Sequence, residues 1–301
     1  PVEVEGDLYS LAACNDIGGR RLVDMMSEFS IETLDVLGEQ IIAMSRVGMM
    51  AEIEKLPKGT YKNSMRIDGY ERELDLVAKK LNLQPGMKVL DIGCGWGGAA
   101  KYFAETHDVS IVGITISQEQ IKLARETCAG LDVDIRLSDY RELDETFDAI
   151  YSIGMFEAVG YKNYRTYFEI VHRCLKKEGV FLLHTIGVDQ STTSTDPWVE
   201  KYIFPNGMMP SSKQITGAIE GLFKIDDWHN FGPDYDKTIM CWHSNFTKHY
   251  QSLKHNYDQR FYRMWTYWLL LSAASFRSGS NHLWQILLSQ PGSKNLSSAF
   301  R

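Results

Sequence analysis

A glycine-rich turn near residue 90 is the first feature that could do chemistry. The segment VLDIGCGWGGAA, residues 89–100, places Gly93, Gly95 and Gly97 between an expected strand and an expected helix, with Trp96 inside the turn. Glycines let the backbone approach a ligand closely, and the helix that follows offers unpaired N–H groups. The spacing differs from the G-x-G-x-x-G of dinucleotide enzymes, and no acidic residue closes the next strand, which ends GITISQ. The pattern predicts a ligand cradle and disfavours a nicotinamide cofactor.

Polar side chains stand at the ends of the same three expected strands. Asp91 precedes the glycines, the second strand is followed by hydroxyl and amide groups, and the third ends with an acceptor and an aromatic ring; the later residues are Thr115, Ser117, Gln120, Asp139 and Tyr140. These groups suit the ammonium, ribose hydroxyls and adenine of S-adenosylmethionine. The plainer interpretation is that the glycines only permit tight packing of strand and helix.

A single carboxylate, Glu157, follows an apolar strand in the stretch SIGMFEAVG, residues 152–160. Ligands of open α/β sheets bind outside the carboxyl ends of the strands, so we expect Glu157 to face that crevice. The alternative is that Glu157 caps the helix expected to begin near Asn163.

The elements that must position these residues alternate along the chain from about Met87. Apolar strands are expected at 88–92, 110–116, 134–137, 147–153 and 180–184, a closing strand at 285–289, and helices at 98–106 and 163–177. Strands separated by helices of this length imply right-handed crossovers and a parallel sheet covered on both faces. The expected fold class is α/β, doubly wound and Rossmann-like.

Residues 1–78 do not follow this rhythm. They contain helical patterns at 19–29 and 31–54 and a turn-like stretch at 56–61. The stretches EVEGDLYSLAACNDIGGRRL and LPKGTYKNSMRIDGYERELDL resemble the hydantoinase B/oxoprolinase family. We therefore expect two parts, a catalytic domain at 79–301 and a helical segment at 1–78. That segment is either a fusion or assembly product or a genuine helical cap that only looks similar to the other family. Pro1 in place of Met suggests a fragment or processed product.

Composition excludes several classes of protein. A net charge of −7 without a basic run disfavours nucleic acid as a partner. The five cysteines lack the close pairs of zinc or dithiol sites, so no metal is expected and a reducing, cytoplasmic compartment fits best. The apolar stretch at 267–276 is far shorter than the roughly 20 residues of a membrane-spanning helix, and no signal peptide is recognised.

From about Leu81 onward the sequence closely resembles the cyclopropane fatty acid synthase family. The stretches that carry the resemblance are KVLDIGCGWGGAA, VGITISQEQ, DYREL, SIGMFEAVG, FLLHTIG, DPWVEKYIFPNG, DWHNFGPDYD and RMWTYWLLLSAASFR. The resemblance implies a class I methyltransferase fold with a mostly parallel seven-stranded sheet. It also implies transfer of the methyl group of S-adenosylmethionine to a cis double bond of a phospholipid acyl chain, followed by proton loss and ring closure.

The resemblance further implies a bound bicarbonate ion as the base. Its ligands would be Glu157, His184, the backbone at Ile186, and Tyr235. His184 and Tyr235 could instead be ordinary core residues. Two departures stand out, because Ala158 occupies the place of the family's histidine and the family's tyrosine- and cysteine-bearing segment ahead of the cofactor domain is not found.

Aromatic and aliphatic residues gather at 198–207, 228–235 and 261–284, where most would pack a core and some would line an acyl channel. The expected partner is unsaturated phospholipid, met peripherally at the inner face of the membrane, and a homodimer is possible. Two other hypotheses remain open, a small-molecule N- or C-methyltransferase and a catalytically impaired cofactor-binding fusion product.

Overall fold

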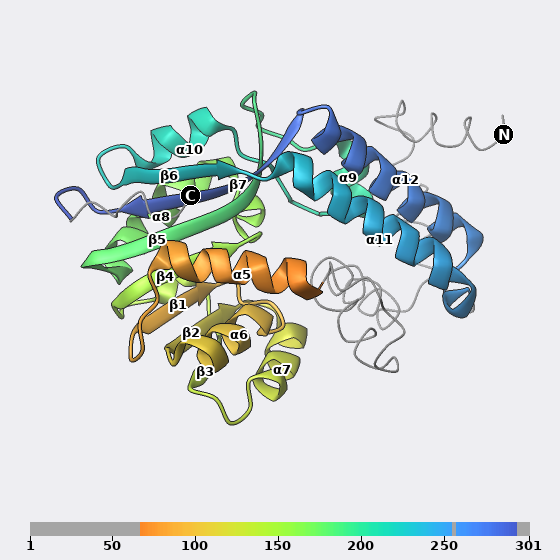
Figure 1. Cartoon of the computed structure of the whole chain (residues 1–301). Helices are drawn as coiled ribbons and strands as arrows, with labels where there is room; N and C mark the ends of the chain where they lie inside the picture. Colours follow the sequence, from red (N-terminus) through yellow and green to blue (C-terminus); the bar gives the residue numbers. More distant parts are fainter. Residues whose placement is uncertain (1–66, 255–256, 294–301) are drawn as a thin grey trace.

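A computed structural model describes residues 67–254 and 257–293 (Figure 1). The helices expected at 19–29 and 31–54 and the turn at 56–61 lie outside these residues. The helices and strands are α5 (Ile67–Leu81), β1 (Lys88–Ile92), α6 (Gly98–His107), β2 (Ser110–Thr115), α7 (Gln118–Thr127), β3 (Val133–Leu137), β4 (Phe147–Ile153), α8 (Tyr164–Cys174), β5 (Leu175–Val188), α9 (Pro197–Tyr202), α10 (Ser212–Ile219), β6 (Lys224–Asn230), α11 (Gly232–Leu253), α12 (Gln259–Arg277) and β7 (Asn281–Ser289). Short 3-10 turns η1 (Tyr140–Glu142), η2 (Phe156–Ala158) and η3 (Tyr161–Asn163) follow β3 and β4.

The strands form one seven-stranded sheet in the order β3-β2-β1-β4-β5-β7-β6. Strands β1 to β5 pair in parallel, whereas β7 is antiparallel to both β5 and β6. The chain order reverses beside β1, and the carboxyl ends of β1 and β4 therefore flank a crevice of the kind that holds ligands in doubly wound proteins. The predicted fold class is confirmed.

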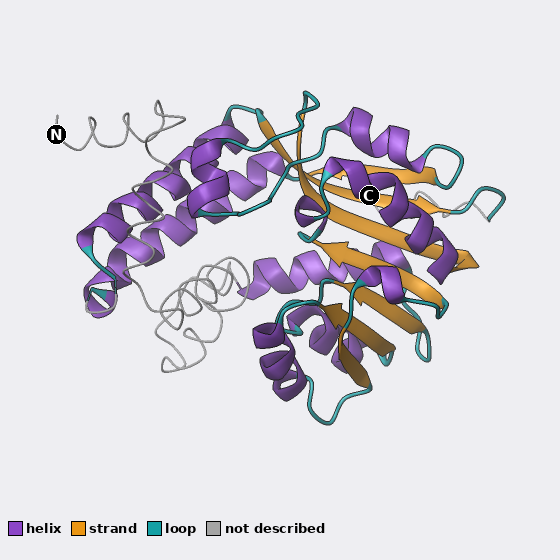
Figure 2. Ribbon diagram, turned by 180° about the vertical axis from the view of Figure 1, so that it is seen from behind, coloured by secondary structure: helices purple, strands orange, loops and turns teal. Residues whose placement is uncertain are grey.

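Helices cover both faces of the sheet (Figure 2). Val89 of β1 belongs to a core cluster with residues of α5, α6 and α7, and its neighbour Leu90 belongs to a cluster with residues of α8 and α10. This division follows from the alternation of side chains along a strand. Strands buried on both faces are mostly apolar, which explains the nearly continuous apolar stretches in the sequence.

Helix α5 forms because its apolar residues recur at helical spacing. Leu74, Val77, Ala78 and Leu81 are all buried against the sheet and α6. A domain boundary at residue 78 would cut this helix and its buried face. Residues 74–81 of α5 thus pack in the same core cluster as the sheet.

Several element bounds differ from the sequence-based expectation. Helix α8 ends at Cys174 rather than residue 177, because β5 begins at Leu175, opposite Phe147 of β4. Residues 176–178, which are exposed, directly follow Leu175 at the start of this strand of 14 residues, although Lys and Glu favour helices. Strand β6, KIDDWHN, was not expected, because an edge strand with few apolar residues carries little periodic signal.

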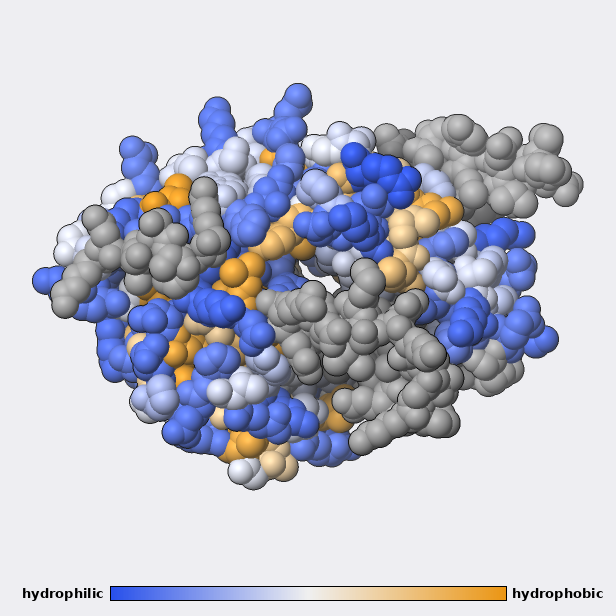
Figure 3. All heavy atoms as spheres, viewed as in Figure 1, coloured by the Kyte–Doolittle hydropathy of each residue, from blue (hydrophilic) through white to orange (hydrophobic). Residues whose placement is uncertain are grey.

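Helices α9, α11 and α12 pack beside the sheet and form what we call the helical lobe, with α11 and α12 as a long helical hairpin (Figure 1). Its core includes Trp198, Phe246, Trp265 and Phe276, so many of the aromatic residues expected in a core are indeed buried. Figure 3 shows the molecule hollowed between the body of the sheet and this lobe. Among the described helices, none has the length and apolarity to cross a membrane.

Candidate functional site

The turn after β1 has the backbone that its glycines allow. Gly93, Gly95 and Gly97 have φ of 83°, 55° and 81°, in the left-handed region that other residues avoid. A Cβ at Gly93 would lie 2.5 Å from Cγ of Met155, whereas a Cβ at Gly95 would meet nothing within 4 Å. The first glycine is required by close packing, and the second borders open space in which a ligand could lie.

The amides of this turn are only partly engaged within the protein. Gly93 and Cys94 donate N–H groups to the carbonyl of Ile114, at 3.0 and 2.9 Å. Helix α6 starts at Gly98, and its N-cap residue, Gly97, offers no side-chain hydrogen bond. Trp96 is buried in the turn, and its indole Nε1 has no hydrogen-bond partner among the described residues. Uncapped N–H groups beside an open space fit a cofactor with carboxylate or hydroxyl acceptors.

The predicted polar residues at the end of β2 are close together and bond to each other. Thr115 Oγ1 donates to Gln120 Oε1 at 2.8 Å, and the Ser117 hydroxyl accepts the Gln120 N–H at 3.2 Å as the cap of α7. Ile116, between them, is 77% exposed at the edge that faces the crevice. Ile116 was not expected at the site, because an isolated apolar residue carries no motif. An exposed aliphatic side chain there offers a contact for the flat face of adenine.

The other predicted cofactor residues have partners within the protein. Asp91 is buried and accepts the hydroxyl of Tyr151 at 2.9 Å. Asp139 accepts the backbone N–H of Arg141 at 2.9 Å and pairs with its guanidinium, which holds the pKa of that carboxyl below its usual range. Tyr140 packs edge-on against Tyr167 at 5.2 Å. Asp139 could therefore bind an adenine amine only by sharing its carboxylate with Arg141.

Glu157 lies in η2, just beyond the carboxyl end of β4. Its Oε1 accepts the backbone N–H of Ile186 on β5 at 2.7 Å. Its Oε2 is buried and has no hydrogen-bond partner among the described residues. The helix-capping alternative is wrong, because Oε1 accepts from Ile186 and Oε2 from no described residue, so neither oxygen accepts an N–H of α8. Glu157 therefore holds one oxygen fixed and presents the other, unpaired, inside the protein.

A buried phenol lies within the electrostatic reach of Glu157. Burial raises the pKa of the Tyr164 hydroxyl well above its usual range, and the Glu157 carboxylate raises it further. The Tyr164 hydroxyl has no hydrogen-bond partner among the residues described. Two unpaired polar groups in one buried region mark a place for a small polar species, because such groups are costly to leave unbonded.

His184 precedes Ile186 by two residues on β5 and therefore shares its face of the sheet. It is 5% exposed, and its Nδ1 lies 3.0 Å from Oε1 of Glu73 on α5. The two atoms are at ion-pair distance without the alignment of a hydrogen bond. Neither Glu73 nor this contact was expected, because an acidic residue on an amphipathic helix normally indicates a solvated face.

The structure brings Glu157, His184 and Ile186 together and places Tyr235 in the adjoining helical lobe. Tyr235 lies in the first turn of α11 and packs edge-on against Phe276 at 4.9 Å. Ile186 and Tyr235 border the same aromatic cluster. Ala158 is exposed. A histidine at that position would therefore lie at the surface.

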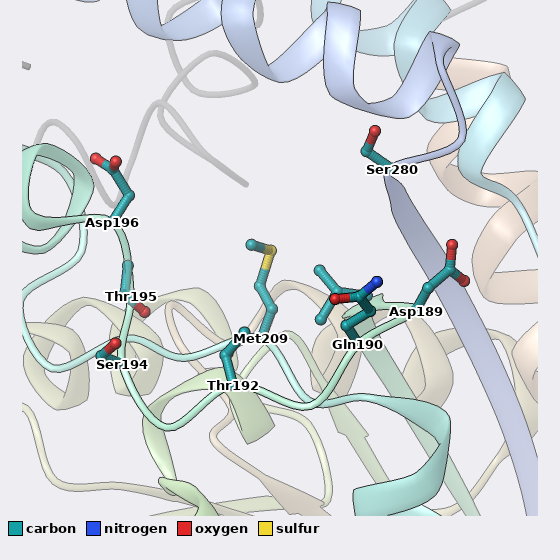
Figure 4. Close-up of a pocket in the computed structure, with 9 residues that line it drawn as sticks. Asp189, Gln190, Thr192, Ser194, Thr195, Asp196, Met209 and Ser280 are labelled. Carbon is teal, nitrogen blue, oxygen red and sulfur yellow. The ribbon is translucent and has the colours of Figure 1, made fainter.

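A separate surface pocket of about 380 Å³ opens beyond the carboxyl end of β5 (Figure 4). It is lined mainly by polar side chains from the segment after β5, among them Asp189, Thr195 and Asp196, with Met209 from the opposite loop. Asp189 pairs with His282 at 2.8 Å, and Asp196 caps α9. The carboxylates thus have structural roles, and the pocket does not include the glycine turn. In the part of the chain that the structure describes, no His, Cys, Asp and Glu cluster could hold a metal ion.

Comparison with family models finds two matches along the chain. A family model described as mycolic acid cyclopropane synthetase matches residues 62–286, and one described as hydantoinase B/oxoprolinase matches residues 1–90. The cyclopropane-fatty-acyl-phospholipid synthase of Escherichia coli (strain K12) is 54% identical over 220 residues, which cover 73% of this chain. The matched part spans 58% of the length of that relative.

Solved structures agree with the sequence comparison. The cyclopropane synthase MmaA2 from Mycobacterium tuberculosis has a TM-score of 0.70 at 26% identity, covering 77% of this chain and 87% of that one. The mycolic acid cyclopropane synthase CmaA1, complexed with SAH and CTAB, has a TM-score of 0.67 at 29% identity, covering 73% and 83%.

Proposed function

Because the chain belongs to the mycolic acid cyclopropane synthetase family, we propose that it is an S-adenosylmethionine-dependent enzyme that cyclopropanates unsaturated acyl chains of phospholipids. The Escherichia coli relative is named for that activity. The observation that carries the proposal is Glu157, whose Oε1 is fixed by Ile186 and whose Oε2 is buried and unpaired among the described residues. A carboxylate prepared in this way can take part in removing a proton from a buried substrate.

The residues around the glycine turn fit S-adenosylmethionine. The open space at Gly95 and the uncapped first turn of α6 would receive its polar groups, and exposed Ile116 would contact adenine. Bound there, the cofactor supplies an electrophilic methyl group. Thr115, Ser117 and Gln120 would keep the end of β2 in place through their mutual hydrogen bonds.

The proposed reaction needs a base as well as a methyl donor. The π electrons of the cis double bond form the new bond to the methyl carbon as its bond to sulfur breaks, which leaves a carbocation on the acyl chain. Loss of a proton from the added methyl group supplies the electron pair that closes the ring. Within this site Glu157 and His184 can orient the base. The negative charge of Glu157 also stabilises the carbocation electrostatically.

Bicarbonate fits this site in part. Its hydroxyl could donate to the unpaired Oε2 of Glu157, which offsets part of the repulsion between the two anions, or to an unprotonated Nε2 of His184. The N–H of Ile186 is already taken by Oε1 of Glu157. We therefore assign bicarbonate binding to Glu157, His184 and Tyr235, with Ile186 acting through Glu157.

A peripheral contact with the membrane surface completes the proposal. The helical lobe exposes large apolar side chains at Phe204, Leu270 and Leu271, and Phe204 packs against Trp268. Exposed aliphatic and aromatic residues favour insertion into the outer part of a bilayer. The acyl chain would enter between this lobe and the sheet, where the surface is hollowed (Figure 3).

The test is transfer of a labelled methyl group. The protein is incubated with methyl-labelled S-adenosylmethionine, bicarbonate and vesicles of cis-unsaturated phospholipid, and in parallel with a panel of amines. Label recovered as cyclopropane lipid supports the proposal. Label only in amines indicates a small-molecule N-methyltransferase, and cofactor binding without turnover indicates the impaired fusion product; either result contradicts it.

A further inference from the structure

Helix α5 is fixed over the antiparallel end of the sheet by two polar contacts. Glu73 and Lys80 lie on one face of the helix, two turns apart. Lys80 is 0% exposed and pairs with Asp227 of β6 at 2.9 Å, and Glu73 reaches His184 of β5 at 3.0 Å. Figure 1 shows α5 crossing the sheet at this place. The carboxylate of Glu73 is therefore held at the imidazole by a helix that is itself anchored.

The chemistry of the contact determines where the imidazole carries its proton. The 3.0 Å contact lacks the alignment of a hydrogen bond, but the negative carboxylate of Glu73 attracts a proton on Nδ1 of His184 and repels a lone pair there, so it favours the Nδ1–H form. The Nε2 atom is then unprotonated and can accept a hydrogen bond. A carboxylate that holds one ring nitrogen also fixes the orientation of the ring, as in catalytic and metal-binding histidines generally.

The neighbour of His184 across the sheet does not compete for this role. Gln285 lies directly opposite His184 in the β5–β7 ladder, so the two side chains share a face. Gln285 is 0% exposed, and both of its amide atoms lack hydrogen-bond partners among the described residues. An amide can donate or accept, so it accommodates either tautomer of His184. The choice of tautomer rests with Glu73.

We propose that Glu73 is a positioning residue that acts through His184. It selects the Nδ1–H tautomer and fixes the ring, so that Nε2, which is then an acceptor, faces the hydroxyl of the anion bound beside Glu157. The proposal rests on the proposed function for its consequence in turnover, whereas the tautomer itself can be measured without turnover. It also assigns part of the site to the stretch that both family models match, residues 62–90.

The first measurement is the tautomer of His184. In protein labelled with ¹⁵N-histidine, long-range ¹H–¹⁵N correlation should show the Nδ1–H form of His184, assigned with a His184→Gln variant. Glu73→Leu should lose that preference, and Glu73→Gln, whose amide oxygen can still accept, should restore it. Asp75→Asn is the matched control, because Asp75 lies on the same helix and accepts the Tyr102 hydroxyl at 2.7 Å, and this variant should leave the tautomer unchanged.

The second measurement is the dependence of lipid methylation on bicarbonate. Glu73→Leu should raise the half-saturating bicarbonate concentration about 10-fold or more and leave that of S-adenosylmethionine within about twofold. Should Glu73→Leu not fold, Glu73→Lys replaces it, because this side chain is 40% exposed. If a Glu73→Leu or Glu73→Lys variant keeps the His184 tautomer and still methylates lipid, the inference about Glu73 is overturned and the proposed function stands. A tautomer that follows Glu73 in a protein without lipid turnover supports the inference and contradicts only the proposed function.

Discussion

Replacing Glu157 by Gln removes the charge of the candidate site with little change in shape. In the unmodified protein the Ile186 N–H donates to Glu157 Oε1 at 2.7 Å. The amide oxygen of Gln can still accept this hydrogen bond, but as a neutral rather than a charged acceptor. Hydrogen bonds to charged groups contribute about 1.5–3 kcal/mol and neutral ones about 0.5–1.5 kcal/mol, so we expect a loss of about 1 kcal/mol in the free energy of unfolding. The variant should remain folded.

The expected effect on turnover is much larger. With its oxygen on the Ile186 N–H, the amide of Gln presents an NH₂ group, which cannot accept the hydrogen bond of the bound base, and it carries no charge to stabilise the developing carbocation. Positioned acid–base groups contribute about 10²–10⁴-fold to rate. That range corresponds to about 3–5 kcal/mol of transition-state stabilisation. The assay compares initial rates of methyl transfer into phospholipid vesicles, with urea unfolding of the same preparations.

Glu169→Gln is the control for a lost surface carboxylate, because Glu169 forms an exposed pair with Arg165 at 2.9 Å. It should change neither rate nor stability appreciably. If Glu157→Gln lost no more activity than this control, the carboxylate would have no role in the reaction. A loss of activity matched by an equal loss of stability would make Glu157 a structural residue only.

Three further predictions concern residues around the site. Lys80→Met breaks a buried ion pair, so the free energy of unfolding should fall by about 3–5 kcal/mol, and the double variant with Asp227→Leu should recover most of it in urea titrations. Gln285→Leu removes a buried amide with no partner among the described residues and should raise the free energy of unfolding by about 1–3 kcal/mol; a decrease would show that the amide is bonded in solution. Gly93→Ala should weaken cofactor binding in calorimetry more than Gly86→Ala does, since both have φ near 80° but only Gly93 is packed against a side chain. Equal effects of the two alanines would contradict the packing argument.

The sequence alone was sufficient for the regular part of the fold. Strands β1 and β4 have the bounds expected from the sequence, 88–92 and 147–153, because a strand buried on both faces is mostly apolar. The glycine turn could also be predicted from the sequence, because few residues other than glycine adopt the positive φ found at Gly93, Gly95 and Gly97. Strand β6 and the start of β5 could not be predicted from the sequence, because pairing with neighbouring strands, rather than local preference, decides their conformation.

For the candidate site the division is similar. The position of Glu157 after an apolar strand and the family resemblance identified it as chemistry-bearing without coordinates. Only the tertiary structure decided that its two oxygens differ, one bonded to Ile186 and one buried without a partner among the described residues. The contact of Glu73 with His184 joins residues more than a hundred positions apart. No local pattern encodes such a contact, because it depends on how α5 crosses the sheet, and that crossing follows from the packing of the whole domain.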